Sequence, residues 1–293
     1  PGKVPPVAAG DDTLFAAAAT AAPGDILLLQ PGEYRIDKSI PLDKPLTIRG
    51  AAGRSSTVLL ARPSLIELHD GGNIRLENLT VDGSPAPDSI GSSLIRTGPE
   101  PIKLNMVIEL AGVKVKNLKA NASYNVITLG KNAFADRIVI RDSSFRDISG
   151  AVVSATAETE DFGQYNVEYL DMIGNDFENV GGPIAAVYRG GTDESTFGPT
   201  VTFRGNRVKN AGKAIAGGHS GTLFLHGVQT TRIEQNIFED SGLVHIAHTV
   251  GTPSTELTDN TFRDTPAPRV EELNYAGEPR AVSTRNTIDG KTL

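Results

Sequence analysis

The sequence predicts an all-β protein, a right-handed single-stranded parallel β-helix (a solenoid) with one capping helix near its N-terminus. Short segments rich in β-branched residues recur, for example at 46–49, 107–110 and 137–141. A phrase of the form Asn-x-Phe or Asn-x-aliphatic follows such segments at a nearly even spacing. After residue 25 no long stretch has the 3.6-residue period of an amphipathic helix. A β-sandwich would need hairpin turns every 8 to 12 residues, so the long repeat favours a solenoid.

The first element in the chain is the only convincing helix, expected at about residues 11–22. Asp11 or Asp12 can serve as its N-cap, alanine dominates its body, and Pro23-Gly24 ends it. A short helix before the first strand can cover the open end of a solenoid, where strand edges would otherwise be exposed. An ordinary helix packed against a sheet is the alternative.

The repeated asparagine phrase is expected to form the corners of the coils. Its members begin at Asn175, Asn206, Asn236, Asn260 and Asn286, spaced by 31, 30, 24 and 26 residues (206−175, 236−206, 260−236, 286−260). Asn78 and Asn117 look like degenerate members, and Ser143 occupies the same slot without an asparagine. Asparagine tolerates the left-handed αL backbone of a corner, and the apolar residue two positions later points inward. These residues are therefore expected to be structural.

The repeat continues through the chain, so a single domain over residues 1–293 is expected, with coils from about 25 to about 290. No stretch approaches the 18 apolar residues of a membrane helix. Twenty-eight Lys and Arg against 35 Asp and Glu give a net charge of −7, which argues against nucleic-acid binding. The absence of cysteine excludes disulfides and thiolate metal sites and suits a periplasmic or secreted bacterial protein. No signal peptide is visible, and the abrupt start at Pro1 is expected of a mature or shortened chain.

Functional groups concentrate in residues 188–199, a glycine-rich turn after an apolar run. Loops on a rigid scaffold are where binding groups are displayed. Arg189 follows the apolar run 184–187 directly and is expected to be buried and held by a carboxylate, either Asp193, Glu194 or one from the preceding acidic turn. A purely local ion pair that closes the turn is the alternative. The candidate substrate-binding residues are Tyr188, Arg189, Asp193, Glu194, His219 and Gln229.

Two further stretches, residues 157–164 and 217–229, are expected to lie one coil before and one coil after this turn, forming one ridge. Glu158, Glu160 and Asp161 are weak candidates for a metal site, and Ca²⁺ is the ion that their hard oxygen atoms would favour. A solvated acidic turn is the default, so no cofactor is assigned. The histidines, including His219 and His226, do not have a metal-ligand spacing.

The sequence resembles the C-terminal β-helix of polysaccharide lyase family 6, which includes alginate lyases and chondroitinase B. The resemblance is carried by residues 157–161 (AETED), 187–199 (VYRGGTDESTFGP) and 225–229 (LHGVQ), and by 22–25, 31–34 and 44–50 near the start. It covers nearly the whole chain, and residues 188–199 are its most specific part. The resemblance implies that catalysis resides in a separate N-terminal β-helix, where a lysine acts as base and an arginine as acid.

This catalytic pair is not reproduced in the sequence. The family places its lysine in a turn one coil before the arginine-containing turn. Arg189 occupies a comparable turn here, but the nearest upstream lysine, Lys131, precedes it by 58 residues (189−131), or about two coils.

The leading functional hypothesis is therefore a C-terminal domain of an alginate-lyase-like enzyme that completes the uronate-polysaccharide cleft or supports assembly. Its partners would be an acidic polysaccharide, a catalytic N-terminal β-helix, or a second copy in a homodimer. One alternative is a complete small lyase in which Arg189 acts with Tyr188 or His226 as base and acid. Another is a non-enzymatic carbohydrate-binding or adhesin-type solenoid.

Overall fold

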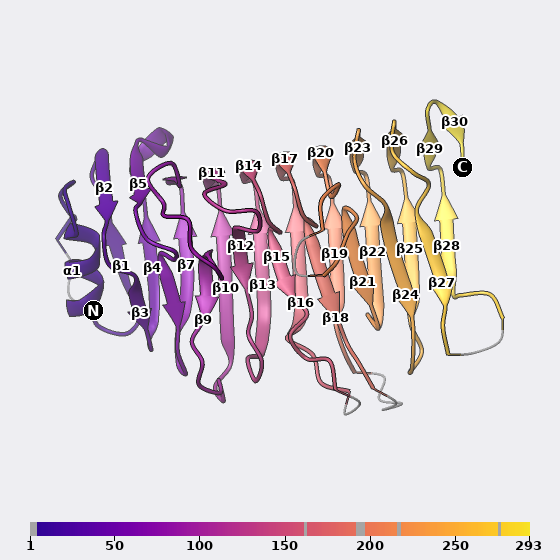
Figure 1. The fold of residues 1–293 in the computed structure, drawn as a ribbon, viewed down its shortest axis with the longest axis horizontal. Helices are drawn as coiled ribbons and strands as arrows, with labels where there is room; N and C mark the ends of the chain where they lie inside the picture. The colour runs from indigo at the N-terminus through magenta and orange to yellow at the C-terminus, as the bar shows by residue number, and fades with distance from the viewer. Residues whose placement is uncertain (1–4, 161–162, 192–196, 216–217, 275–276) are drawn as a thin grey trace.

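The structure, a computed structural model, describes residues 5–160, 163–191, 197–215, 218–274 and 277–293. Three sheets run along the whole solenoid, and every pair of neighbouring strands is parallel except the last, β29 with β30 (Figure 1). Ten strands in the first sheet correspond to ten coils. The predicted parallel β-helix is confirmed.

Each of the first nine coils contributes one strand to each sheet, in the order sheet 1, sheet 2, sheet 3, and the last coil contributes β28 to sheet 1 and β29 and β30 to sheet 2. Sheet 1 contains β1 (Asp25–Leu28), β4 (Pro45–Arg49), β7 (Asn73–Glu77), β10 (Met106–Ala111), β13 (Ala135–Arg141), β16 (Val167–Ile173), β19 (Thr200–Arg204), β22 (Thr230–Glu234), β25 (Ser254–Thr258) and β28 (Ala281–Thr284). Sheet 2 contains β2 (Gly32–Ile36), β5 (Ser56–Leu60), β8 (Thr80–Asp82), β11 (Lys114–Leu118), β14 (Ser144–Ile148), β17 (Asp176–Val180), β20 (Arg207–Ala211), β23 (Ile237–Glu239), β26 (Thr261–Arg263), β29 (Thr287–Ile288) and β30 (Lys291–Thr292). Sheet 3 contains β3 (Ile40–Leu42), β6 (Ile66–Leu68), β9 (Ser93–Thr97), β12 (Asn125–Thr128), β15 (Val153–Ala155), β18 (Ala185–Tyr188), β21 (Leu223–His226), β24 (Val244–His248) and β27 (Arg269–Glu272).

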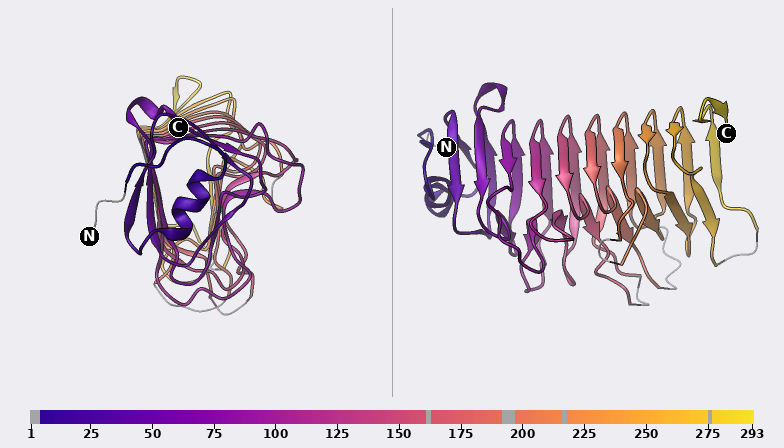
Figure 2. Two further views of the ribbon diagram at one scale, coloured as in Figure 1. Left: turned by 90° about the vertical axis from the view of Figure 1, so that its left-hand side faces the viewer. Right: turned by 45° about the horizontal axis from the view of Figure 1, so that its top comes forward.

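The helix α1 (Thr13–Thr20) lies across the N-terminal end of the solenoid (Figure 2). It buries Leu14 and Ala18, so the predicted cap is present. It ends two residues earlier than expected, because Ala21 is already extended. Asp12 occupies the N-cap position but makes no side-chain cap; its carboxylate accepts a hydrogen bond from the Asp37 backbone N–H instead. A short 3₁₀ turn, Ala52–Arg54, is the other helical element among the described residues.

The corners between sheets 1 and 2 contain two residues each from β7 onward. The second corner residue is the predicted asparagine in the last five coils, and it is 0–3% exposed. The αL conformation belongs to the residue before it, for example Gly174 (φ 67°) before Asn175, so the prediction that these asparagines adopt αL was wrong. A residue in αL makes the turn, and the asparagine then points into the core. Asn78 occupies the first corner position with φ 50°, and Asn117 lies at the end of β11, so neither belongs to this column.

Each buried asparagine is bonded to the next along the axis. The Asn206 side-chain oxygen accepts from the Asn175 backbone N–H at 2.9 Å, and the same relation links Asn206 to Asn236, Asn236 to Asn260 and Asn260 to Asn286. Ser143 extends the column, since its backbone N–H donates to the Asn175 oxygen. All buried polar groups of these asparagines thereby find partners, as burial requires.

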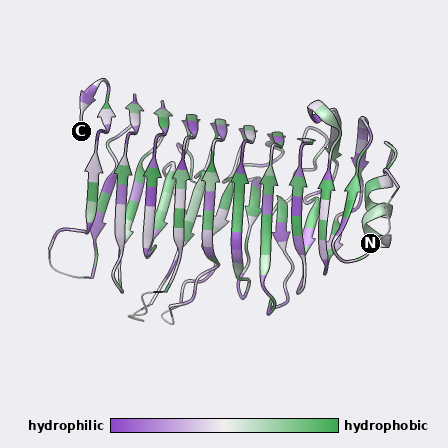
Figure 3. Cartoon of the chain, turned by 180° about the vertical axis from the view of Figure 1, so that it is seen from behind, coloured by the Kyte–Doolittle hydropathy of each residue, from purple (hydrophilic) through white to green (hydrophobic). Residues whose placement is uncertain are grey.

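A stack of phenylalanines fills the core beside this asparagine ladder. Phe145, Phe177, Phe203, Phe238 and Phe262 stack with successive ring centroids 4.9–6.1 Å apart. Four of them come from sheet 2, but Phe203 comes from β19 of sheet 1 and fills the level at which sheet 2 offers the smaller Val208. Hydrophobic and hydrophilic residues alternate along the strands (Figure 3), so one face of each sheet is buried and the other is exposed. No helix among the described residues is long and apolar enough to cross a membrane.

Candidate functional site

The loops that follow the strands of sheet 3 are unequal in length and project from one edge of the solenoid (Figure 1). Residues 156–166 follow β15, residues 189–199 follow β18 and residues 227–229 follow β21, in three successive coils. The predicted ridge therefore exists for these segments. Residues 218–221 do not belong to it, because they precede β21 and lie at the opposite end of that strand.

Arg189 is the most deeply buried charged residue of this ridge. It is 1% exposed, as its position after an apolar run predicted. Its Nη1 atom donates to the Phe197 carbonyl oxygen at 2.6 Å, and its guanidinium carbon lies 5.7 Å from the centre of the Tyr165 ring. A Cβ atom on Gly198 would lie 2.5 Å from Nη1, so the loop closes tightly over the guanidinium only because that residue is glycine.

Three of the predicted acidic residues lie outside the described residues: Asp161, Asp193 and Glu194. The hypothesis that one of them holds Arg189 therefore stays a prediction. The contacts that are described join Arg189 to the loop on both sides, through Phe197 and through an isolated β-bridge to Tyr165.

Tyr188 points in the opposite direction from Arg189, onto the outer face of sheet 3. It is half-buried, and its ring stacks on His226 with centroids 4.4 Å apart. His226 Nδ1 lies 3.2 Å from the Arg189 carbonyl oxygen, to which it can donate. Burial lowers the pKa of His226 more than this hydrogen bond raises it, so the imidazole is neutral near pH 7. The third candidate, His219, stacks on Phe224 at 4.2 Å, and burial lowers its pKa as well.

Gln229 connects successive loops of the ridge. It is 5% exposed, its Nε2 atom donates to the Val250 carbonyl oxygen at 2.9 Å, and its Oε1 atom accepts from the Thr252 backbone N–H at 3.1 Å. Its side-chain oxygen and nitrogen are both engaged within the protein, so Gln229 holds the next loop in place, and its predicted contact with substrate stays a prediction.

The acidic turn after β15 is tied to the coil before it. Glu160 forms an ion pair with Lys131, which raises the pKa of that lysine through the hydrogen bond and the opposite charge. Glu158 is 4% exposed and accepts from the Asn132 backbone N–H at 2.6 Å. The two side chains therefore have separate partners. Within the described part of the chain, no group of three or more His, Asp or Glu could hold a metal ion.

A cavity of about 420 Å³ opens beside Glu158. Its lining residues are Asn132, Ala133, Phe134, Glu158, Gln164 and Tyr165. The Phe134 and Tyr165 rings meet edge to face, with centroids 5.6 Å apart. The sequence did not single out either ring, because nothing in its spacing distinguishes an aromatic residue of a loop from one of the core.

Lys131 and Arg189 follow β12 and β18, with β15 between them. Two coil spacings of about 4.8 Å separate those strands. The loop one coil before Arg189, where the family would place its lysine, contains Glu158 and Glu160 in this structure.

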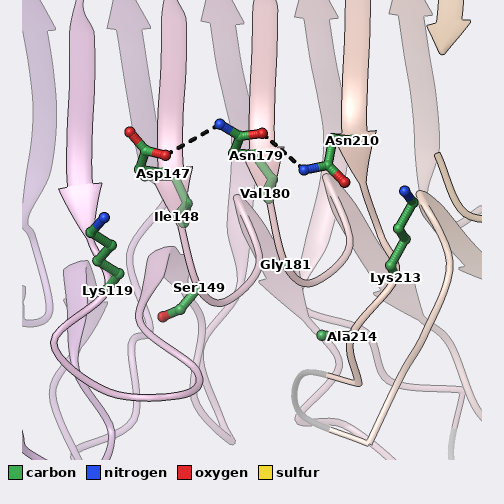
Figure 4. A pocket seen from close by; sticks show the side chains of 10 residues that line it. All are labelled: Lys119, Asp147, Ile148, Ser149, Asn179, Val180, Gly181, Asn210, Lys213 and Ala214. Atoms are coloured by element: carbon green, nitrogen blue, oxygen red, sulfur yellow. Dashed lines mark hydrogen bonds between the residues drawn. The ribbon is translucent and has the colours of Figure 1, made fainter. Parts of the chain in front are cut away.

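A second groove lies at the corner between sheets 2 and 3, away from the ridge (Figure 4). Its volume is about 410 Å³, and Asp147, Asn179 and Asn210 line it as a hydrogen-bonded row, with Lys119 and Lys213 at its two ends. All three residues of the row have positive φ (57°, 56° and 51°), so they form the tight turns of this corner. Their spacing of 32 and 31 residues (179−147, 210−179) was a signal that sequence inspection could have found.

The chain was compared with known protein families, curated proteins and solved structures. No family model matches the chain, and no curated protein matches it. Among solved structures, the PL6 family alginate lyase AlyGC superimposes with a TM-score of 0.93 at 40% sequence identity, over 96% of this chain and 39% of that chain. An arginine mutant of AlyGC gives the same values. The chain spans about two fifths of that enzyme's length, and over that span it is similar to the PL6 family alginate lyase in both fold and sequence.

Proposed function

We propose that this chain is the C-terminal β-helix of an alginate-lyase-like polysaccharide lyase, where it completes the substrate cleft or supports assembly and does not itself carry out the reaction. The likeness to AlyGC over 96% of this chain but only 39% of that enzyme supports a part-enzyme role. Its partners would be an acidic polysaccharide such as alginate, a catalytic β-helix, and a second copy in a homodimer. A periplasmic or secreted location belongs to the same proposal.

The burial of Arg189 is the observation that carries this proposal. β-Elimination on a uronate removes a ring proton while the carboxylate is neutralised and the leaving oxygen is protonated. An arginine that is 1% exposed beneath residues 197 and 198 cannot reach a sugar without opening its loop. Glu158 and Glu160, one coil earlier, add negative charge, which would repel an anionic sugar.

The complete-lyase alternative requires Arg189 to act with Tyr188 or His226. Tyr188 and His226 do meet, but on the outer face of sheet 3, whereas the Arg189 guanidinium is enclosed by the loop. The three groups therefore do not converge on one point. In the adhesin-type alternative the chain would also bind a carbohydrate, as in the proposed function, but it would have no catalytic β-helix as its partner.

The test is the ultraviolet absorbance of the unsaturated uronate product when the purified chain is mixed with alginate. We expect no product from this chain alone and increased turnover when it is joined to a catalytic β-helix. Tyr188→Phe and His226→Gln serve as variants that leave the core intact. Product formation by the chain alone that either variant abolishes would establish the complete-lyase alternative instead.

A further inference from the structure

The outer face of sheet 3 carries a row of rings that the core does not use. We call Tyr188, His219, Phe224, His226 and His245 the ring patch. Tyr188 stacks on His226 at 4.4 Å, His219 on Phe224 at 4.2 Å, and Phe224 meets His245 edge to face at 6.0 Å. Phe224 and His226, two residues apart on β21, are 6.4 Å apart and join these pairs into one cluster.

The register of sheet 3 builds this patch from three successive coils. Tyr188 on β18 is paired with His226 on β21, and Phe224 on β21 with His245 on β24. The residues that alternate with them, Val187, Leu225 and Ile246, are at most 1% exposed. The rings therefore point away from the core, where a separate stack of phenylalanines already fills the interior.

The patch concentrates residue types that are scarce in this chain. The sequence has five histidines and no tryptophan, and three of the five histidines belong to the patch. All five residues are half-buried, so each keeps part of its ring at the surface, although His226 Nδ1 and His245 Nε2 are already engaged with the Arg189 carbonyl oxygen and with Glu271.

We propose that the ring patch is the contact surface for an acidic polysaccharide, a uronate chain that lies extended along the solenoid axis. This inference rests on the function proposed above and names where the polymer meets this chain. The patch is part of an open sheet face whose strands repeat every 4.8 Å or so, which suits a long repeating polymer better than a compact small molecule. Aromatic and imidazole rings offer apolar contact to sugar C–H groups, while Tyr188 and the histidines offer hydrogen-bond groups to hydroxyls and carboxylates.

Charge does not oppose an acidic polymer at this place. The chain as a whole carries −7, so a polyanion is repelled from most of its surface. His245 bonds Glu271 at 2.5 Å, and Arg269 lies 2.5 Å from the same carboxylate, which lowers the pKa of Glu271. Among the described residues, the carboxylate that is bonded to the patch, Glu271, is thus compensated by two nitrogen-bearing partners.

Protonation would add positive charge to the patch. The titratable and charged groups that face His226 and His219 are one another, His245, Glu271 and Arg269, with His248 and Glu272 at the loop ends of the same strands. Burial lowers the pKa of His219 and His226, so these two imidazoles take up protons only below the ordinary histidine pKa, at a pH where carboxylates remain charged. Binding should therefore strengthen as the pH falls.

The test is calorimetric titration of the full 293-residue chain with alginate oligosaccharides. Tyr188→Ala and Phe224→Ala remove one ring each, and we expect about tenfold weaker binding for each, the equivalent of one lost aromatic contact. Tyr169→Ala is the matched control, because Tyr169 is 41% exposed on sheet 1 and stacks on Arg137. It should bind as the unchanged chain does. Circular dichroism confirms folding, and His219→Glu, in a loop, reports on the patch if a strand variant fails to fold.

Four outcomes overturn the inference: no binding of alginate by the chain, equal losses for Tyr188→Ala and Tyr169→Ala, equal binding of a neutral glucan, or weaker binding at about pH 5.5 than at about pH 7.5. If the ring-patch variants changed the sedimentation of the protein but kept its alginate affinity, the patch would be a contact for a second copy or for a catalytic β-helix. That result would likewise refute the inference. Suppose that alginate binding depends on the ring patch but that joining this chain to a catalytic β-helix does not increase turnover. The inference would then stand, and the proposed function would be refuted.

Discussion

The chain turns through short, regular corners at one edge of the solenoid and through connections of unequal length at another. At the corner between sheets 1 and 2, two residues suffice in every coil from β7 onward, and the buried asparagines from Asn175 to Asn286 bond one another along the axis. At the edge after sheet 3, the connections range from two residues (43–44) to eleven (156–166 and 189–199). The regular edge makes the coils stack, and the irregular edge is where Arg189 and Glu158 lie, next to the face of sheet 3 that carries the ring patch. Repetition in this protein indicates structure, and departure from repetition indicates the candidate site.

The largest expected effect is loss of a central ladder member, because the ladder is buried and continuous. Asn236→Ala leaves the Asn206 backbone N–H and the Phe203 carbonyl oxygen without their partners. We expect a loss of about 3 kcal/mol in the free energy of unfolding, since each unsatisfied buried group costs roughly 1 to 3 kcal/mol. Urea denaturation measures it. Asn105→Ala is the control, because that asparagine is exposed, and it should change the free energy by less than about 0.5 kcal/mol. Equal effects at the two positions would mean that the ladder contributes nothing special.

Replacement of Arg189 should have a somewhat smaller effect, because it affects one loop rather than a column. Arg189→Leu keeps an apolar stem but leaves the Phe197 carbonyl oxygen without its donor. We expect a loss of roughly 2 to 3 kcal/mol, in the range of buried hydrogen bonds to charged groups. Lys131→Leu removes a cation of the same ridge whose ion pair with Glu160 is exposed, and it should leave the midpoint of denaturation unchanged. A larger loss at Lys131 than at Arg189 would contradict the distinction between a buried and a solvated charge on this edge.

The smallest expected effect is a pH dependence confined to the irregular edge. His248 is 1% exposed, its Nε2 atom lies 2.9 Å from Thr255 Oγ1, and burial lowers its pKa below the ordinary value of 6.5. The unfolded chain therefore binds this proton at a higher pH than the folded protein does. Stability is full above about pH 6.5 and falls as the pH drops from there toward the folded pKa, by less than about 1.4 kcal/mol per pH unit for one group.

His248→Gln should flatten this slope in urea denaturation series between about pH 7.5 and about pH 5.5. Asn236→Ala should shift the whole curve without changing its slope, because the ladder contains no titratable group. An unchanged slope in His248→Gln would show that the pH dependence arises elsewhere.

The sequence by itself determined the solenoid, its approximate repeat, the capping helix and the burial of Arg189. This was possible because stacked coils repeat the same inward positions, so the spacing between Asn206 and Asn236 indicates the length of one coil. It could not determine which corner residue takes the αL conformation, or that Phe203 of sheet 1 would complete a stack of sheet 2. Those depend on how neighbouring coils fill one shared volume.

Only the tertiary structure decided how the candidate site is divided. Tyr188 and Arg189 are adjacent in sequence, yet alternation along β18 turns Tyr188 to the surface and the closed loop encloses Arg189. Gln229 was predicted to contact substrate, but its partners in the next coil lie more than twenty residues away along the chain. The ring patch likewise joins residues from Tyr188 to His245, of which Tyr188, Phe224, His226 and His245 are brought together by sheet register and His219 by the segment before β21. Side-chain direction and contact between coils are properties of the packed solenoid, and no local pattern of residues encodes them.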